Sequence, residues 1–125
     1  RPASLPANFA ILKIFAPKAR FKKFMRLEHY SVKKLKKQIK DIIKSYIDLE
    51  QYQLFFFGSR VRGDNFERAD VDVGVKGPRS LPLSIKGEIK EALENLPTLY
   101  KFDFIDFQDT SAKFKKEALK YTELL

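Results

Sequence analysis

Residues 57–63, with the sequence FGSRVRG, combine the residue types that a phosphate-binding turn needs. Gly58 has no side chain, so the backbone there can approach a ligand closely, and Gly63 lets the chain turn again. Ser59 offers a hydroxyl group and a backbone N–H at the mouth of the turn. Arg60 and Arg62 add fixed positive charge in a fork geometry that suits phosphate oxygens. The turn could therefore hold a triphosphate, although ordinary turns also use such residues.

Two carboxylates follow this turn at a spacing typical of metal ligands on a strand. Asp70 and Asp72 are two residues apart, so in a strand their side chains share one face while Val71 and Val73 point to the other. Neighbouring carboxylates repel each other unless a cation lies between them, and Mg²⁺ takes oxygen ligands from carboxylates, phosphates and water. The alternative is a solvent-exposed strand face, which the nearby glycine–serine turn makes less favoured.

A third carboxylate is available in the segment FDFID at residues 102–106. Asp103 and Asp106 are three residues apart, so an ideal strand points them to opposite faces. Only one of the two can therefore join the Asp70 and Asp72 pair.

Helices and strands must bring these residues together, and the hydrophobic spacing predicts their order. After Ser31, which suits a helix N-cap, apolar residues recur every three or four positions and lysines fill the remaining surface. Short apolar or alternating runs predict strands. The expected elements are a helix at 31–47, a strand at 52–57, a polar loop at 59–69, a strand at 70–75, a helix at 84–96, a strand at 100–107 and a helix at 111–125. This order predicts one small α/β (α+β) domain.

The composition excludes several other kinds of site. The chain has 125 residues, which is room for one domain, and 44% hydrophobic residues can fill its core. It has no cysteine and a single histidine, His29, which excludes disulfides, thiol catalysis and cysteine-ligated metals and argues against a multi-histidine site. No apolar run of 18 residues is present, so no membrane span is predicted. Any bound metal must be held mainly by carboxylates.

The net charge of +9 lies in the first part of the chain. Residues 1–50 hold 13 Lys and Arg against 4 Asp and Glu, whereas residues 51–125 hold 12 of each. This basic half predicts attraction to polyanions such as RNA, with a solvated lysine-rich surface as the alternative. Residues 1–24 contain three prolines and no acid, and are expected to be a basic N-terminal extension. They are either a segment upstream of a domain at 25–125 or a targeting peptide.

The turn and the carboxylates together resemble a known signature. Residues 58–63 (GSRVRG) and 69–73 (ADVDV) are similar to the glycine–serine and paired-aspartate motifs of minimal nucleotidyltransferases, a branch of the DNA polymerase β-like superfamily. The segment FDFID resembles the strand that carries the third catalytic carboxylate of that family. The resemblance covers about residues 28–125 and departs from the pattern at Ala69, where serine is common, and at Val73-Gly74, where a leucine-led run is usual.

The resemblance implies a nucleotidyltransferase fold, which is a small mixed β-sheet flanked by helices. It also implies that Asp70, Asp72 and Asp103 are catalytic and hold two Mg²⁺ ions, with Asp106 as a non-catalytic neighbour. The nucleoside triphosphate, ATP, would be bound by the turn residues Gly58, Ser59, Arg60 and Arg62. By the family pattern the chain would be a cytoplasmic antitoxin that transfers AMP to a tyrosine of a partner HEPN-type ribonuclease toxin.

Two other interpretations remain open at this point. The chain could be a catalytically idle antitoxin that neutralises its partner by binding alone, or a basic RNA-binding module that uses residues 1–50. The presence of all three carboxylates and of the complete turn favours the enzyme.

Overall fold

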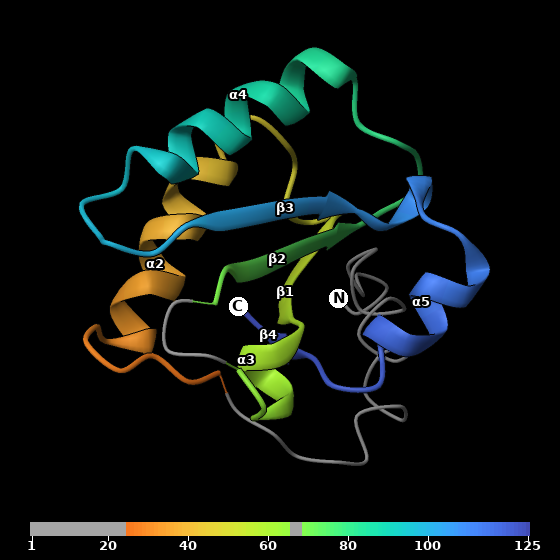
Figure 1. Cartoon of the computed structure of the whole chain (residues 1–125). Coiled ribbons are helices and arrows are strands. Elements are labelled where there is room, and N and C mark those ends of the chain that lie inside the picture. Colours follow the sequence, from red (N-terminus) through yellow and green to blue (C-terminus); the bar gives the residue numbers. More distant parts are fainter. Residues whose placement is uncertain (1–24, 66–68) are drawn as a thin grey trace, which may run out of the picture.

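A four-stranded mixed β-sheet organises the chain in the computed structural model, which describes residues 25–65 and 69–125 (Figure 1). The strands lie in the order β3-β2-β1-β4, where β2 and β3 are parallel and the other two pairs are antiparallel. The expectation of a mixed sheet flanked by helices is confirmed. The strands are β1 (Gln53–Phe57), β2 (Val71–Lys76), β3 (Phe102–Asp106) and β4 (Glu123–Leu124).

Two 12-residue helices cover one face of the sheet and a shorter helix covers part of the other (Figure 1). Ser31 begins the first long helix, because its side chain accepts a hydrogen bond from the backbone N–H of Lys34. The long helices are α2 (Val32–Ile43) and α4 (Leu83–Glu94), and the shorter elements are α3 (Ser59–Arg62), the 3₁₀ turn η3 (Phe107–Asp109) and α5 (Ala112–Ala118). Among the described residues, no helix has the length and apolar character that crossing a bilayer requires.

The main hydrophobic core lies between the sheet and the two long helices. Alternate residues of β2, namely Val71, Val73 and Val75, are fully buried against α2 and α4. Because side chains alternate along a strand, Asp72 and Gly74 face the opposite side of the sheet. On that side the rings of Phe55, Phe57 and Phe107 form a second cluster next to α5. Asp72 lies on this second face as well, beside the aromatic cluster.

The end of the chain differs from the helix expected at 111–125. Helix α5 ends at Ala118, and the chain then extends and pairs with β1 as strand β4. The spacing of Ala118, Tyr121 and Leu125 suggests a helix, but the free edge of β1 offers hydrogen bonds that an extended segment can use. The Leu125 N–H donates to the Leu54 carbonyl oxygen at 3.2 Å.

Two further boundaries differ from the sequence-based expectation. Residues 59–62, expected in a polar loop, form the helical turn α3, and the first long helix ends at Ile43 rather than at residue 47. The interpretation of residues 1–24 as an extension falls outside the described residues.

Candidate active site

The predicted site residues meet at one end of the sheet. Strand β1 is antiparallel to β2, and β2 is parallel to β3, so the last residue of β1 lies beside the first residues of β2 and β3. Phe57 is opposite Asp72, and Asp72 is in turn opposite Asp103. The strand pairing thus places the residues 58–59 turn next to carboxylates on two neighbouring strands.

Asp72 and Asp103 form a carboxylate pair on one face of the sheet. They are register partners in the parallel β2–β3 ladder, so their side chains point to the same side. Partial burial, followed by the negative charges of Asp103 and Asp70, raises the pKa of Asp72 to about 6. Asp70 itself is exposed at the start of β2. Asp103 and Asp70 are therefore close enough for their charges to repel that of Asp72, and a cation at this position would relieve the repulsion.

Gly58 lies directly against the Asp72 carboxylate. A Cβ atom built on Gly58 would overlap the Asp72 side chain, and the glycine has φ of +84°, which residues with a side chain rarely adopt. Gly58 therefore lets the turn approach the Asp72 carboxylate, and its close approach to a ligand stays a prediction.

Ser59 begins the helical turn α3 immediately after Gly58. The Gly58 carbonyl oxygen accepts from the N–H groups of Val61 and Arg62 at 3.1 and 3.0 Å. The Ser59 carbonyl oxygen accepts from the Gly63 N–H at 2.8 Å, and Gly63 then ends the turn with φ of +97°. These bonds hold the half-buried Ser59 at the carboxylate end of the sheet.

Arg62 lies on the carboxylate side of this turn. Its side chain is partly exposed and pairs with Asp64 at 3.3 Å. Its positive charge also acts on Asp72, where it opposes the rise in pKa. A contact between Arg62 and an anionic ligand at the carboxylate pair stays a prediction.

The side chain of Arg60, expected to bind phosphate, points into the protein interior. Its side chain is fully buried, and its guanidinium donates to the carbonyl oxygens of Ala69 and Arg26 at 2.9 and 2.8 Å. It also forms an ion pair with Glu28 at 3.2 Å and stacks on the Tyr100 ring, 4.7 Å from its centroid. The guanidinium is therefore enclosed by protein groups, and a contact between Arg60 and a nucleotide stays a prediction.

Asp106 lies on the other face of β3 from Asp103, as strand parity predicted. It is buried, and its two carboxylate oxygens accept from the N–H groups of Leu81 and Gln108 at 2.7 and 3.0 Å. These bonds fix the chain before α4 and after β3. Asp103, and not Asp106, is the acid that lies beside Asp72. Its role as a metal ligand stays a prediction.

The donor chemistry of the site fits Mg²⁺. Oxygen atoms of Asp72 and Asp103 lie together with Asp70 nearby, and Mg²⁺ is commonly held by one or two carboxylates plus phosphate and water oxygens. Within residues 25–65 and 69–125, no group of three or more acidic or histidine side chains converges closely enough to hold a metal unaided. Phosphate and water oxygens would therefore have to complete the coordination.

Two residues of this region were missed by sequence reasoning. Glu28 and Tyr100 enclose Arg60, and neither belongs to a motif. Tyr100 also lines a groove of about 770 Å³ at the same end of the sheet, together with His29, Tyr30 and the fully exposed Leu99. The only sequence signal for this groove is a run of apolar and aromatic residues just before β3.

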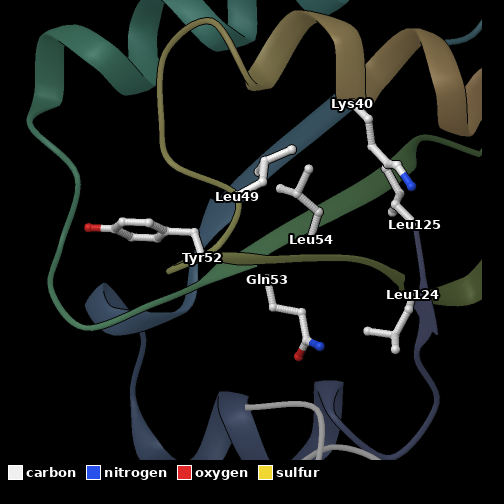
Figure 2. A pocket seen from close by; sticks show the side chains of 7 residues that line it. All are labelled: Lys40, Leu49, Tyr52, Gln53, Leu54, Leu124 and Leu125. Carbon is white, nitrogen blue, oxygen red and sulfur yellow. The ribbon is translucent and has the colours of Figure 1, made fainter. Parts of the chain in front are cut away.

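A second pocket lies at the opposite end of β1 and is separate from the carboxylates. Figure 2 shows its lining, which includes Lys40 of α2, Gln53 at the start of β1 and Leu124 of β4. Its volume is about 210 Å³. Because Gly58 follows the other end of β1, this pocket takes no part in the candidate site.

Comparison with protein families gives one match over most of the chain. The family described as "Polymerase beta, Nucleotidyltransferase" matches residues 37–125, which include the turn and all three carboxylates. No curated protein matches significantly.

Several solved structures share this fold. A tri-AMPylated Shewanella oneidensis HEPN toxin in complex with MNT antitoxin matches with a TM-score of 0.57 and 16% identity, over 74% of this chain and 69% of that chain. A toxin–antitoxin structure with AMP-PNP matches with a TM-score of 0.60 and 18% identity, over 71% and 70% of the two chains. The toxin–antitoxin MntA-HepT matches with a TM-score of 0.55 and 15% identity, over 74% and 69%.

Proposed function

The chain belongs to the polymerase β-type nucleotidyltransferase family, and we propose that it transfers AMP from ATP to a hydroxyl group in a Mg²⁺-dependent reaction. The observation that supports this most is the Asp72–Asp103 pair facing the glycine–serine turn. In the proposed reaction the acceptor oxygen bonds to the α-phosphorus, the bond to the β-phosphate breaks, and pyrophosphate leaves. The acceptor hydroxyl gives up its proton to a carboxylate oxygen of the site or to water.

Each residue of the site has a role in this proposal. Gly58 and Ser59 bring backbone and hydroxyl groups to the triphosphate, and Arg62 neutralises part of its charge. Asp70, Asp72 and Asp103 would hold two Mg²⁺ ions. When bound, the ions would supply charge stabilisation at the reacting phosphates. Burial, followed by repulsion from Asp103 and Asp70, raises the pKa of Asp72, and this repulsion gives the carboxylates a preference for a bound cation.

We propose that the acceptor is a tyrosine of a HEPN-type ribonuclease toxin and that the chain acts as its antitoxin. The support is similarity in fold to antitoxins from such complexes, one of which contains a tri-AMPylated toxin. The groove beside Tyr100, which includes the exposed Leu99, offers such an acceptor a surface just before β3, the strand that carries Asp103. Because ATP is plentiful in the cytoplasm, the proposal places the reaction there.

The test is transfer of radiolabel from α-³²P-ATP to a HEPN-type toxin added as the acceptor. With Mg²⁺, the wild-type protein should label the toxin, and Asp72→Asn should reduce labelling at least about 100-fold because a metal ligand is lost. Asp109→Asn is the matched control, since this exposed acid pairs with Lys86 and Ser80 away from the pair and should leave labelling intact.

Two results would contradict the proposal. Absence of labelling by the wild-type protein, or equal labelling by Asp72→Asn, would exclude the proposed chemistry. If both proteins neutralise the toxin without labelling it, the chain is a catalytically idle antitoxin.

A polyanion-binding role is the second candidate, and the outer face of α2 supports it. Lys33, Lys34, Lys37, Lys40 and Lys44 are exposed there, and Asp41 is the one acid of the helix, paired with Lys37 and Lys44. RNA binding by this face should weaken steeply as salt increases, because each neutralised phosphate releases counterions. A salt-independent affinity, or none, would exclude it.

A further inference from the structure

Arg60 is the largest fully buried side chain among the described residues, and it connects the parts of the candidate site. It directly follows Ser59 in the turn. Its Nε donates to the carbonyl oxygen of Ala69, the residue before Asp70, at 2.9 Å. A single side chain therefore spans from the turn to the start of the strand that carries the paired aspartates.

The same guanidinium also reaches the third strand and the segment before α2. It stacks on the ring of Tyr100, which precedes β3 by two residues and Asp103 by three. One nitrogen, Nη1, donates to the Arg26 carbonyl oxygen at 2.8 Å and to the Glu28 carboxylate at 3.2 Å. The Tyr100 hydroxyl in turn accepts from the backbone N–H of His29 at 3.1 Å, so the segment before α2 and the segment before β3 also bond to each other directly.

Burial of a charged side chain is unfavourable unless hydrogen bonds and an ion pair compensate for the lost water. Arg60 meets that requirement with groups from three separate stretches of chain, two of which lead directly into catalytic strands. Lysine could keep the ion pair with Glu28, but it lacks the planar fork that reaches Ala69 and Arg26 at once and stacks on Tyr100.

We propose that Arg60 is the positioning residue of the active site: it fixes the distance between the Ser59 turn and the strands that carry Asp70, Asp72 and Asp103, without touching the substrate. This inference rests on the proposed nucleotidyl transfer for its kinetic consequence. Its structural consequence, a turn and two strand starts held by one guanidinium, can be measured whether or not transfer is observed.

The kinetic experiment compares Arg60→Lys with Arg62→Gln in the labelling reaction. Misalignment of the turn should lower kcat by about 100-fold in Arg60→Lys with little change in KM for ATP, because small displacements of reacting groups cost rate rather than affinity. Arg62→Gln, which removes a charge facing the ligand, should raise KM for ATP more than it lowers kcat. A rise in KM alone for Arg60→Lys would overturn the proposal, since it would indicate a phosphate contact.

The second measurement is amide hydrogen exchange without any ligand. The Val71 N–H donates to the Lys101 carbonyl oxygen and the Gly63 N–H to that of Ser59, so these amides report on the two strand starts and on the turn. In Arg60→Lys both should exchange at least about tenfold faster, while Phe56 in the centre of β1 changes by less than about twofold. A uniform change at all three amides would mean that Arg60 only supports global stability, and no change at any would overturn the proposal outright.

Tyr100 provides a matched pair of variants in case Arg60→Lys does not fold. Tyr100→Phe keeps the ring under the guanidinium and should retain wild-type exchange at Val71, whereas Tyr100→Leu removes the stacked ring and should speed exchange there. Equal exchange in both variants would contradict a role for the stacked guanidinium in holding β3 to the turn. If the wild-type protein shows no transfer but these exchange patterns hold, the proposed function fails and the positioning role stands.

Discussion

At the scale of single residues, Gly58 and Asp72 constrain each other directly. The Asp72 carboxylate occupies the space that a side chain at position 58 would need, and the backbone there has a positive φ. We expect Gly58→Ala to lower the free energy of unfolding by more than about 2 kcal/mol and to abolish transfer, because it adds backbone strain and displaces the carboxylate.

Gly87→Ala is the control for this substitution. Gly87 is an exposed residue of α4, and a Cβ there would meet nothing within 4 Å. Alanine should stabilise the helix by about 0.5–1 kcal/mol and leave transfer unchanged. Denaturant unfolding and the labelling assay test both variants, and a Gly58→Ala protein with full activity would contradict the arrangement described for the turn.

Asp103 and Asp106 should behave as opposites when each is replaced by asparagine. Asp103→Asn should fold normally but lose transfer and the rise in melting temperature that Mg²⁺ and ATP produce. Asp106→Asn should lower the free energy of unfolding by about 1–3 kcal/mol, because one of the two backbone N–H groups of Leu81 and Gln108 loses its acceptor. It should keep the response to Mg²⁺ and ATP at temperatures where it is folded, and the reverse assignment would mean that Asp106 is the ligand.

Asp72 should make the metal-free protein less stable as the pH rises from about 4 to about 6. Its pKa is raised from 3.8 to about 6 in the folded protein, so in this interval the unfolded chain has already lost the proton that the folded chain retains. The stabilising contribution is complete below pH 3.8 and is lost above pH 6. Urea unfolding of the wild-type protein and of Asp72→Asn across this range isolates the effect, and a difference between them that does not vary with pH would contradict it.

At the scale of elements, strand β4 is held by the Glu123 carboxylate. One oxygen accepts from the Met25 N–H, and the other pairs with Lys36 of α2 at 2.6 Å. Glu123→Gln should therefore lower the free energy of unfolding by about 2 kcal/mol, since a largely buried charged hydrogen bond is weakened. Glu117→Gln, which breaks an exposed pair with Lys120, should change it by less than about 0.5 kcal/mol. Thermal unfolding measures both variants, and an equal loss of stability in Glu123→Gln and Glu117→Gln would show that Glu123 does not connect β4 to α2.

The sequence predicts the elements well where side-chain periodicity and strand pairing agree. The alternation of aspartate and valine at 70–73 correctly separates the core face of β2 from the carboxylate face, and parity correctly separates Asp103 from Asp106. The C-terminal segment fails, because the spacing of Tyr121 and Leu125 is helical while the decisive interaction is the free edge of β1. The burial of Arg60 could not be predicted for a related reason. Its burial depends on Glu28 and Tyr100, which are distant in sequence and belong to no motif.

At the scale of the whole molecule, the polar site residues lie at one end of the sheet and the aromatic residues lie further along the same strands. The polar chemistry lies where β1 ends and where β2 and β3 begin, and the groove lined by Tyr100 opens at the same end. On the face of the sheet that carries Asp72, the phenylalanine cluster and α5 cover the part away from this end. On the opposite face, α2 and α4 cover the main hydrophobic core. A partner that reaches the carboxylates would therefore approach the end of the sheet rather than either helical layer.

The pairing of Asp72 with Asp103 also bears on how fast the chain folds and unfolds. The connection between β1 and β2, residues 58–70, is shorter than that between β2 and β3, residues 77–101, so the antiparallel pair can close first. The two carboxylates would then approach each other only after the folding barrier has been crossed. Removing their repulsion with Asp103→Asn should slow unfolding and leave the refolding rate nearly unchanged, which the two arms of a denaturant chevron measure separately. Faster refolding would instead show that the parallel strands are already aligned in the transition state.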